Sequence, residues 1–399
     1  MKKQVYKLKD VCNITGGYAF KSTQFTNIGY PLIRIGEISD KRINIDSNTV
    51  HINDEIEKYE KYIVKKGDIL IALSGATTGK FGIYEKNEIA LLNQRVAKLY
   101  PTDRISNGYL YHYMNKLQDV IFDKASGCAQ PNISTNEVGN IEIFIPEQKK
   151  QEKIVKILDK GLELINKRKV QLESLDELVK SRFIEMFGDP INNPMGWEVK
   201  KLNDISTKIL SGNTPKGGSQ VYVDKGVLFL RSQNVWKNRL ELDDVAYIDQ
   251  EIHNKMTKSS LKNRDILMTK TGRINTENSS LGRAAMYLGE DDSANINGHV
   301  YLIRLKQDII NEFVLYILTS NEYRGYIRSV CVGGIDKRQI NKEHLEEFPI
   351  IFPPTELQIQ FADFIEQVDK LKFEMEKSLK ELEDNFNSLM QKAFKGELF

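Results

Sequence analysis

The feature that most constrains this chain is an internal repeat that runs through nearly all of its 399 residues. The segment Asn140–Pro146, NIEIFIP, precedes one long helical pattern, and the related segment Phe348–Pro353, FPIIFP, precedes a second. Pro146 and Pro353 lie 207 residues apart, and the same offset holds from Gly127/Gly334 to Phe187/Phe394. A constant offset indicates a rigid element, because insertions accumulate in loops.

Upstream of these segments the repeat continues with a changing offset. Three pairs of segments recur at offsets of 194, 197 and 204 residues: Lys7–Val11 with Lys201–Ile205, Val64–Ile71 with Leu261–Met268, and Asn93–Val96 with Asn297–Val300. A period of about 200 residues is too long for a solenoid, so the chain holds two copies of a whole domain, each followed by a whole helix. Two similar but non-identical copies of a domain are suited to recognising two different targets.

Composition excludes several classes of protein. With 40% hydrophobic and 28% charged residues, the chain has the make-up of an ordinary globular protein. No apolar run approaches the roughly 18 residues that span a bilayer, and Met1–Tyr6 lacks the apolar stretch of a secretory signal. Cys12, Cys128 and Cys331 are odd in number and far apart, which predicts a cytoplasmic location without disulfides or a cysteine zinc site.

The pattern along the chain predicts four parts: a globule over residues 1–146, a long helix over 147–189, a second globule over 190–353 and a second long helix over 354–399. Each globule alternates short β-rich runs with Gly, Asn and Ser turns, which predicts an α+β fold. A short helix is expected at Asn107–Met114 and, in the second copy, at Asn311–Leu318.

Both long helices carry an apolar seam with steps of three, four or seven residues, the period of a coiled coil. The seams are Ile154, Leu158, Ile165, Leu172, Leu175, Val179 and Met186 in the first helix, and Phe361, Ile365, Val368, Met375, Leu379, Leu382, Phe386 and Leu389 in the second. Matching seams predict that the helices pack on each other as an antiparallel coiled coil. The expected fold is therefore two repeated mixed α/β globules separated by a rod of two long helices, with pseudo-twofold symmetry.

The search for catalytic motifs finds one tempting signal, Ser74–Lys80, SGATTGK, after an apolar strand. A phosphate loop needs four residues between its glycines and Ser or Thr after the Lys, whereas Gly75 and Gly79 are separated by three residues and Phe81 follows. Phe81–Tyr84 is also predicted to be a strand, so no helix N-terminus is available for phosphate. A polar loop aimed at a ligand is the preferred interpretation, with Lys270–Ser280 as its diverged counterpart.

Other chemistry is equally unsupported by the sequence. The segment Phe352–Thr355 has two prolines but not the amide and aromatic neighbours of an adenine-methyltransferase motif, and the five histidines lack metal-ligand spacing. We therefore predict no catalysis, no metal and no cofactor in this chain alone.

The duplicated order of these signatures resembles the specificity subunit of type I restriction–modification systems, the HsdS family, over essentially the whole chain. The resemblance implies that each globule is a target-recognition domain that reads one half of a bipartite, asymmetric site on double-stranded DNA. It also implies that the helices space these domains and dock two methyltransferase subunits, and that restriction subunits, which translocate and cut DNA, join this core. S-adenosylmethionine, ATP and Mg²⁺ would then be bound by the partners, which carry out adenine N6 methylation or ATP-driven cleavage. The small net charge of +2 agrees with a duplex that is shared with partners.

Candidate DNA-binding residues are polar residues of loops next to strands, chosen because Arg and Lys suit guanine while Asn and Gln suit adenine. They are Lys21, Arg34, Ser74, Thr77, Thr78, Lys80, Gln94, Arg95, Gln130 and Asn132 in the first globule, and Lys216, Arg231, Gln233, Asn234, Lys270, Arg273, Asn275, His299, Lys337 and Arg338 in the second. For any one of them the alternative is a solvated residue or a hydrogen bond that stabilises the fold. Arg34/Arg231 and Asn93/Asn297 persist in both copies, which favours a structural or phosphate-contacting role.

Apolar residues away from the seams are candidates for partner docking, because two paired helices cannot bury both stripes. They are Val155, Leu162, Leu178, Phe183 and Phe187 on the first helix and Ile359, Phe364, Leu371 and Phe373 on the second. The alternative is burial against the protein's own globules. Two other functions stay open at this point, namely a two-domain scaffold on a coiled-coil rod that binds no DNA, and an enzyme with unrecognised motifs.

Overall fold

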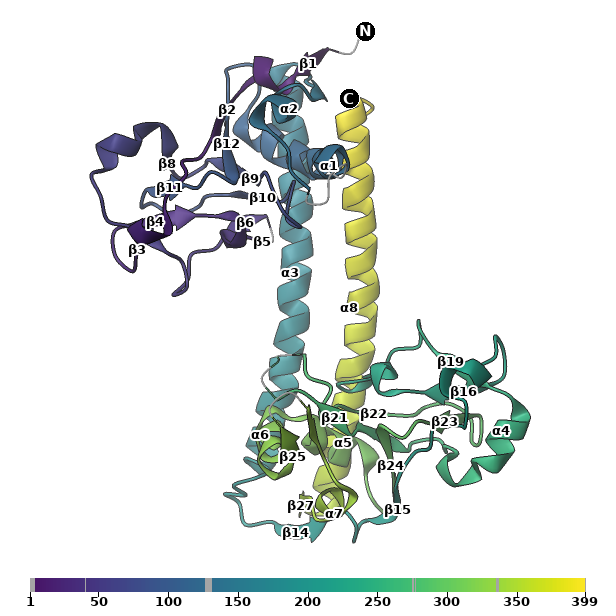
Figure 1. Ribbon diagram of the computed structural model, residues 1–399. Helices are drawn as coiled ribbons and strands as arrows, with labels where there is room; N and C mark the ends of the chain where they lie inside the picture. Colours follow the sequence, from purple (N-terminus) through teal and green to yellow (C-terminus); the bar gives the residue numbers. More distant parts are fainter. Residues whose placement is uncertain are drawn as a thin grey trace. The chain divides into compact units, whose positions relative to one another are not determined.

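The structure is a computed structural model that describes residues 4–39, 41–125, 131–274, 276, 278–334 and 337–398. The chain divides into two compact units, the first formed by Met1–Val170 with Glu376–Phe399 and the second by Gln171–Met375. Each unit combines one mixed α/β globule with parts of both long helices, α3 (Gln148–Phe187) and α8 (Thr355–Lys395) (Figure 1). The expected fold class, repeated mixed globules with long antiparallel helices, is confirmed. The four-part division stays a prediction, because the compact units take each helix in halves.

Unit 1 contains two main sheets and a strand pair. The first sheet has the order β2-β12-β9-β10-β6-β5, the second has the order β3-β7-β4-β11-β8, and β1 pairs with β13. The bounds are β1 (Val5–Lys7), β2 (Cys12–Gly16), β3 (Phe25–Thr26), β4 (Tyr30–Ile33), β5 (Ile38–Ser39), β6 (Arg42–Ile43), β7 (His51–Ile52), β8 (Ile63–Val64), β9 (Ile69–Ala72), β10 (Phe81–Ile83), β11 (Ala90–Leu92), β12 (Val96–Pro101) and β13 (Glu142–Phe144). Strands β9 and β11 are buried along their whole length, which explains why they read as continuous apolar runs.

Unit 2 repeats the central part of this topology. Its sheets have the orders β15-β24-β20-β22, β19-β16-β23 and β21-β26-β25, with the pairs β14-β27 and β17-β18. The bounds are β14 (Glu198–Lys201), β15 (Ser206–Ser211), β16 (Val227–Leu230), β17 (Val235–Trp236), β18 (Arg239–Leu240), β19 (Ala246–Ile248), β20 (Ile266–Thr269), β21 (Thr271–Gly272), β22 (Ala284–Met286), β23 (Ala294–Ile296), β24 (Val300–Leu305), β25 (Val332–Gly334), β26 (Lys337–Gln339) and β27 (Pro349–Phe352). Strand β24 lies between β15 and β20 as β12 lies between β2 and β9, and β16 runs parallel to β23 as β4 runs parallel to β11.

The helices of the globules partly follow the sequence-based expectation. The helix expected at Asn107–Met114 is longer in the structure, α1 (Asn107–Ala125). Its counterpart is split into α5 (Asn311–Thr319) and α6 (Asn321–Val330), because Ser320 leaves the helical conformation and its side chain caps α6 by accepting from the Tyr323 amide. The short helices are α2 (Thr135–Gly139), α4 (Gln250–Lys255) and α7 (Lys342–Glu346).

In each unit the two long helices pack antiparallel. In unit 1, a Cβ built on Gly161 would lie 2.8 Å from the Phe386 ring, and Lys169 forms an ion pair with Glu383 at 2.8 Å. In unit 2, Asp176 pairs with Lys372 at 2.6 Å, and Lys372 stands at the position that corresponds, at the 207-residue offset, to the seam residue Ile165 of the first helix. The buried seam residues are Ile154, Leu158 and Ile165 on α3 and Phe361, Ile365, Val368 and Phe386 on α8.

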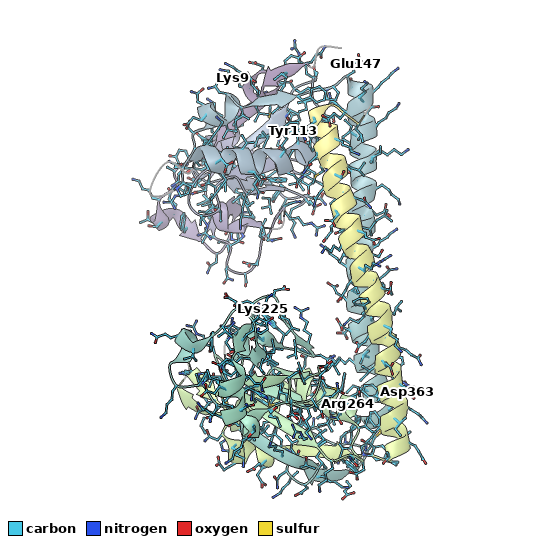
Figure 2. The ribbon with its side chains drawn as sticks, turned by 90° about the vertical axis from the view of Figure 1, so that its right-hand side faces the viewer. Lys9, Tyr113, Glu147, Lys225, Arg264 and Asp363 are labelled. Carbon is cyan, nitrogen blue, oxygen red and sulfur yellow. The ribbon has the colours of Figure 1, made fainter. Side chains whose placement is uncertain are left out.

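Aromatic residues attach the globules to the helices. In unit 1, Phe394 of α8 packs on Tyr109 and Tyr113 of α1, with ring centroids 5.6 and 4.7 Å apart. Figure 2 labels Tyr113 beside the end of α8. In unit 2, Phe187 of α3 packs on Phe313 of α5 at 5.0 Å. Phe187 and Phe394 are separated by the constant 207-residue offset, so the same side chain at the end of each helix enters the core of a globule.

A buried glutamine holds each strand-to-helix junction. Gln151, 1% exposed, donates to the carbonyls of Arg104 and Pro146 and accepts from the Ser106 amide at 2.9 Å. Gln358, also 1% exposed, donates to the Pro353 carbonyl at 2.8 Å. These bonds tie the first turn of each long helix to the preceding segment, which accounts for the absence of insertions between Pro146 and Gln151 and between Pro353 and Gln358.

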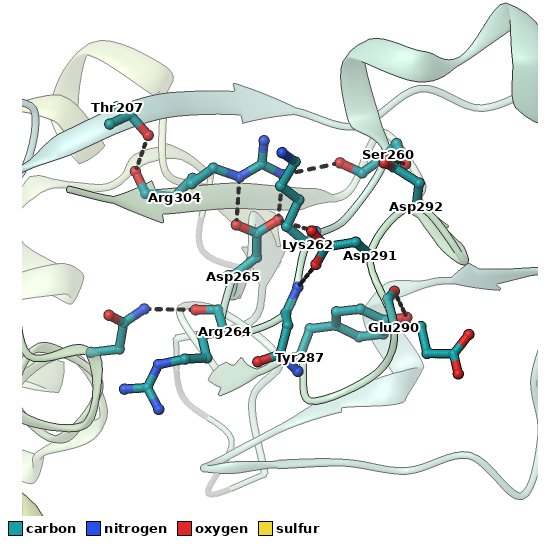
Figure 3. A network of polar contacts seen from close by, with 12 residues as sticks. Thr207, Ser260, Lys262, Arg264, Asp265, Tyr287, Glu290, Asp291, Asp292 and Arg304 are labelled. Carbon is teal, nitrogen blue, oxygen red and sulfur yellow. Dashed lines mark hydrogen bonds and ion pairs between the residues drawn. The ribbon is translucent and has the colours of Figure 1, made fainter. Parts of the chain in front are cut away.

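In both units a cation neutralises a carboxylate that directly precedes a central strand, β9 in unit 1 and β20 in unit 2. Asp265, 1% exposed, accepts two hydrogen bonds from the Arg304 guanidinium at 2.8 and 2.7 Å, and Arg304 also donates to the Ser260 carbonyl (Figure 3). In unit 1, Asp68 lies 3.6 Å from Lys98, whose ammonium donates to the Ile63 carbonyl. Arg304 therefore makes the closer, bidentate pair, which is the stronger arrangement.

We expect Arg304→Met to destabilise unit 2 by about 3–5 kcal/mol, because it leaves the Asp265 carboxylate buried without its cation. The matched change in unit 1, Lys98→Met, should cost less, because the Asp68–Lys98 contact is longer and not bidentate. Thermal unfolding of the two variants measures the difference. Equal losses in the two variants would show that the geometry of the pair does not matter.

Candidate DNA-recognition edges

In unit 1, loops from distant parts of the chain meet at one edge of the sheets, which we name edge 1. It consists of residues 17–21, 34–37, 73–80, 93–95 and 131–133. Four backbone hydrogen bonds join these loops: Gly17 N to Val96 O at 3.0 Å, Asn93 N to Ile33 O at 3.0 Å, Leu73 N to Arg95 O at 2.8 Å, and Ile133 N to Leu73 O at 2.9 Å. The fold thereby brings together most of the candidate residues of the first globule.

Unit 2 builds the same arrangement, edge 2, from residues 212–216, 231–234, 270–273, 297–299 and 337–340. Its four corresponding bonds are Gly212 N to Val300 O at 2.9 Å, Asn297 N to Leu230 O at 3.0 Å, Lys270 N to His299 O at 2.8 Å, and Ile340 N to Lys270 O at 2.9 Å. Each length agrees with its counterpart in edge 1 to within 0.1 Å. The backbone frame of the edge is therefore common to both units, although the side chains on it differ.

A glycine makes the frame possible in each unit. A Cβ built on Gly17 would lie 2.1 Å from the Asn93 carbonyl oxygen, and one built on Gly212 would lie 2.4 Å from the Asn297 carbonyl oxygen. Only glycine permits such a close approach between the first loop and the neighbouring turn. The next residues, Tyr18 and Asn213, also bond across the edge, to Leu92 O at 2.9 Å and Ile296 O at 3.2 Å.

The repeated asparagines form the neighbouring turn. The Asn93 side-chain oxygen accepts from the Arg95 amide at 3.4 Å, and that of Asn297 accepts from the His299 amide at 3.0 Å. The Asn93 and Asn297 carbonyls also accept from Val96 and Val300, which closes the turn. A structural role for this pair, one of the two roles expected from its persistence, agrees with these bonds.

The exposed candidates lie on these frames. They are Lys21, Lys80, Gln94, Arg95 and Asn132 at edge 1, and Lys216, Gln233, Arg273, His299 and Lys337 at edge 2, with Ser74, Thr77 and Lys270 half-buried beside them. Gln130 and Asn275 lie outside the described residues. Sequence reasoning overlooked the exposed Tyr18 and Asn213, although their position directly after the repeated glycines was a usable signal.

Two candidates need correction, because their side chains are used by the fold. Thr78 is 2% exposed, and its hydroxyl lies within hydrogen-bond distance of the Gly75 and Pro131 carbonyls at 2.7 and 3.1 Å. Asn234 is 1% exposed, donates to the carbonyls of Glu241 and Asp244, and accepts from the Arg231 amide at 2.9 Å. Neither side chain is accessible to a base, so the prediction that they contact DNA is wrong for this structure.

Three candidate arginines are anchored by neighbours within their own unit. Arg34 pairs with Glu37 at 2.8 Å, Arg231 pairs with Asp244 at 3.1 Å, and Arg338 donates to the Cys331 carbonyl at 3.1 Å. These guanidinium groups are half-buried. An anchored guanidinium is suited to a fixed phosphate contact more than to reading a base edge.

The polar loops after the central strands differ between the units. In unit 1, β10 follows the Ser74–Lys80 loop directly, as the sequence predicted, so no helix N-terminus is available there for phosphate. In unit 2, the loop after β20 surrounds a hollow of about 360 Å³ that is lined by Thr271, Gly272, Arg273, Thr276, Asn278, Ser279, Ser280 and Lys337. Two cations and several hydroxyl groups thus border this part of edge 2.

Other charged side chains lie near the hairpin lysine of each unit. Burial lowers the pKa of Lys41, between β5 and β6, and the charge of Lys169 on α3 acts in the same direction. Burial likewise lowers the pKa of Lys237, between β17 and β18; nearby Asp176 opposes this shift and Arg324 adds to it. Lys41 thus has a like charge near it, which favours the binding of an anion, whereas Lys237 lies among charges of both signs.

Among the residues that the structure describes, no group of three or more His, Cys, Asp or Glu side chains could hold a metal ion. In the same part of the chain, no helix is long and apolar enough to cross a membrane.

The helix residues predicted to dock partners fall into three groups. Phe183 and Phe187 are 1% and 0% exposed in the core of unit 2, so the prediction is wrong for them. Val155, Leu162 and Phe364 are half-buried against the protein's own cores, as the alternative expected. The exposed members are Leu178, Ile359, Leu371 and Phe373, and for them docking stays a prediction; Leu164 and Ile184 are exposed apolar residues that the sequence reasoning did not include.

We expect Gly212→Ala to destabilise unit 2 by about 1–3 kcal/mol, because the added methyl group would overlap the Ile296 and Asn297 carbonyl oxygens. The control is Gly325→Ala in α6, where a Cβ would meet no described atom within 4 Å. That change should raise stability by up to about 1 kcal/mol, since alanine favours a helix more than glycine does. Thermal unfolding distinguishes the two, and an unchanged midpoint for Gly212→Ala would mean that the close approach is unimportant.

Comparison with known proteins agrees with this geometry. A family model described as the type I restriction modification DNA specificity domain matches residues 1–174 and 194–384, one match for each repeat. The specificity subunit of the type I restriction enzyme EcoBI from Escherichia coli is 24% identical over 424 aligned positions, which cover 98% of this chain and 85% of the relative.

Two solved structures share the fold. The S subunit of the type I restriction–modification system of M. genitalium superposes with a TM-score of 0.56 at 14% identity and covers 99% of this chain and 96% of that chain. A chain from work described as the structural basis of complex assembly and conformational transition of the type I R-M system gives a TM-score of 0.59 at 17% identity, and covers 100% of this chain and 99% of that chain. Because the family model matches both repeats over most of the sequence, this chain belongs to the family of type I restriction–modification specificity subunits.

Proposed function

We propose that this chain gives a type I restriction–modification complex its DNA sequence specificity, with edge 1 and edge 2 each reading one half of a bipartite site on double-stranded DNA. The observation that carries the proposal is the common backbone frame: four hydrogen bonds repeat between the edges, while the exposed side chains on them differ. A constant frame with variable side chains is what two readers of different sequences need.

The chemistry of the exposed side chains supports reading in the major groove. Edge 1 presents Gln94, Arg95 and Asn132, and edge 2 presents Arg273, His299 and Lys337. Amide and guanidinium groups match the donors and acceptors of adenine and guanine edges in that groove. Because the two sets are unlike, the proposed half-sites are unlike, and the whole site is asymmetric.

The anchored arginines, and Lys41 at the hairpin of unit 1, would contact phosphates. Arg34 and Arg231 occupy the same position in the two units and keep their guanidinium groups fixed by carboxylates. Phosphate contacts of this kind fix the orientation of a protein on a duplex and carry no sequence information themselves. The net charge of +2 supports a complex in which other subunits supply much of the remaining positive charge.

In this proposal the chain performs no chemistry itself. Two methyltransferase subunits would use S-adenosylmethionine to methylate adenine at N6, and restriction subunits would use ATP and Mg²⁺ to translocate and cleave DNA. The complex would act in the cytoplasm. Exposed apolar side chains on the long helices, Leu178, Ile359, Leu371 and Phe373, support a docking role for these helices.

A domain exchange tests independent reading. Residues 197–353 are replaced by the corresponding segment of another family member, and the variant is expressed with its methyltransferase subunits. Sequencing of methylated adenines should show one half-site changed and the other retained, because each edge is built within its own unit. A change in both half-sites would contradict independent reading, and methylation without any sequence preference by the parent complex would contradict the proposed function.

A pair of charge substitutions tests docking. Leu371→Glu with Phe373→Glu should abolish association with the methyltransferase subunits, because both side chains are at least half exposed and an apolar interface would have to bury the new charges. The control places the same two charges at exposed polar positions of the same helix, Gln360→Glu with Gln367→Glu. Size-exclusion chromatography with light scattering measures the complex, and an intact complex in the first variant would rule out this docking face.

A further inference from the structure

We propose that the two residues after the repeated asparagine, Gln94-Arg95 at edge 1 and Gly298-His299 at edge 2, determine specificity, and that Arg95 reads a guanine in the half-site of unit 1. This inference rests on the proposed function and assigns part of it to one turn. It predicts which half-site changes when the turn of each unit is altered.

The backbone of this turn is fixed in the same way in both units. The Arg95 and His299 carbonyls accept from the Leu73 and Lys270 amides, both at 2.8 Å, and their own amides donate to the preceding asparagine side chain. A side chain at position 95 or 299 therefore starts from the same place on the same frame. Exchanging the side chains should exchange what they read without moving the loop.

The side chains at the tip of the turn are available to a ligand. Gln94, Arg95 and His299 are exposed, and within the described part of the chain their hydrogen bonds are made by backbone atoms. The guanidinium of Arg95 has no ion pair with the described residues, whereas Arg34, on the adjacent loop of the same edge, pairs with Glu37. Arg95 can therefore extend toward DNA without breaking a contact that the fold requires.

The chemistry of these side chains favours a purine. An arginine donates two hydrogen bonds to O6 and N7 of guanine in the major groove, and a glutamine pairs with N6 and N7 of adenine. His299 can donate a single hydrogen bond from a ring nitrogen to such an acceptor, and Gly298 has no side chain. Edge 1 thus has two reading groups at a place where edge 2 has one, which makes this turn a source of the difference between the half-sites.

The structure leaves room to convert one turn into the other. A Cβ built on Gly298 would meet Gly212 O and Thr214 Oγ1 at 3.7 Å, which is ordinary van der Waals contact, and Gly298 does not adopt the left-handed conformation. A side chain at this position is therefore compatible with the fold. The double variant Gly298→Gln with His299→Arg should keep the frame of edge 2 and give it the side chains of edge 1.

The experiment uses the full chain in complex with its methyltransferase subunits, and the sequences of methylated adenines are the readout. His299→Arg, alone and with Gly298→Gln, should create a preference for guanine at one position of the second half-site, by roughly tenfold to a hundredfold. The first half-site should be unchanged. Conversely, Arg95→Ala should remove a guanine preference at one position of the first half-site only.

The control variant Asn254→Arg adds the same positive charge on α4, next to the strand end opposite edge 2, and should leave both half-sites unchanged. Competition binding of the same complexes to duplexes that differ at single base pairs gives a second measurement, which does not depend on methylation. Equal tightening on all duplexes by His299→Arg would overturn the inference, because it would indicate a phosphate contact.

Unchanged half-sites in a complex that still methylates its own site would also overturn the inference while leaving the proposed function intact. A parent complex that binds all duplexes alike would instead overturn the proposed function. For a variant that folds but does not methylate, competition binding to the same duplexes still measures its sequence preference.

Discussion

The close approach of a glycine to the neighbouring turn is the constraint on which each recognition edge depends. Gly17 and Gly212 lie so near the Asn93 and Asn297 carbonyls that no larger residue fits without a shift of the backbone. This contact places the first loop beside the turn that begins at Asn93 or Asn297. The Arg95 and His299 carbonyls of that turn accept hydrogen bonds from the Leu73 and Lys270 amides, which follow β9 and β20. Loops that are tens of residues apart in sequence are thereby held at fixed spacing, which the proposed recognition of DNA requires.

The long helices serve the globules as well as each other. Leu158, Ile165 and Phe386 of the seams are buried. Phe183, Phe187 and Phe394, which lie outside the seams, enter the cores of the units. A globule that packs on both helices is stabilised by them, so it would not be expected to retain its full stability when cut from them. This shared burial also reduces the apolar surface that remains for partners to the exposed residues of α3 and α8.

Each unit buries a carboxylate next to a cation, although the cation differs between the repeats. Asp68 and Asp265 both lie at the start of the central strand and both need a cation, yet Lys98 and Arg304, which supply it, come from different positions of the neighbouring strand. Both cations also donate to the same relative carbonyl, that of Ile63 or Ser260. The requirement to neutralise a buried carboxylate is therefore kept although the residue that meets it has moved.

The sequence alone determined the repeat, the mixed α/β class, the two long helices and most of their seam, because these follow from offsets and from apolar periodicity, which are local properties. It could not decide which apolar helix residues face a partner, since Phe183 and Leu178 look alike in a helical pattern and only packing buries one of them. It likewise could not separate Thr78 and Asn234, whose side chains bond to backbone carbonyls of other residues in their unit, from Arg95 and Lys337, which face solvent. Those distinctions depend on packing and on hydrogen bonds that apolar periodicity does not encode, including the contact of Thr78 with the distant Pro131 carbonyl, and only the tertiary structure decides them.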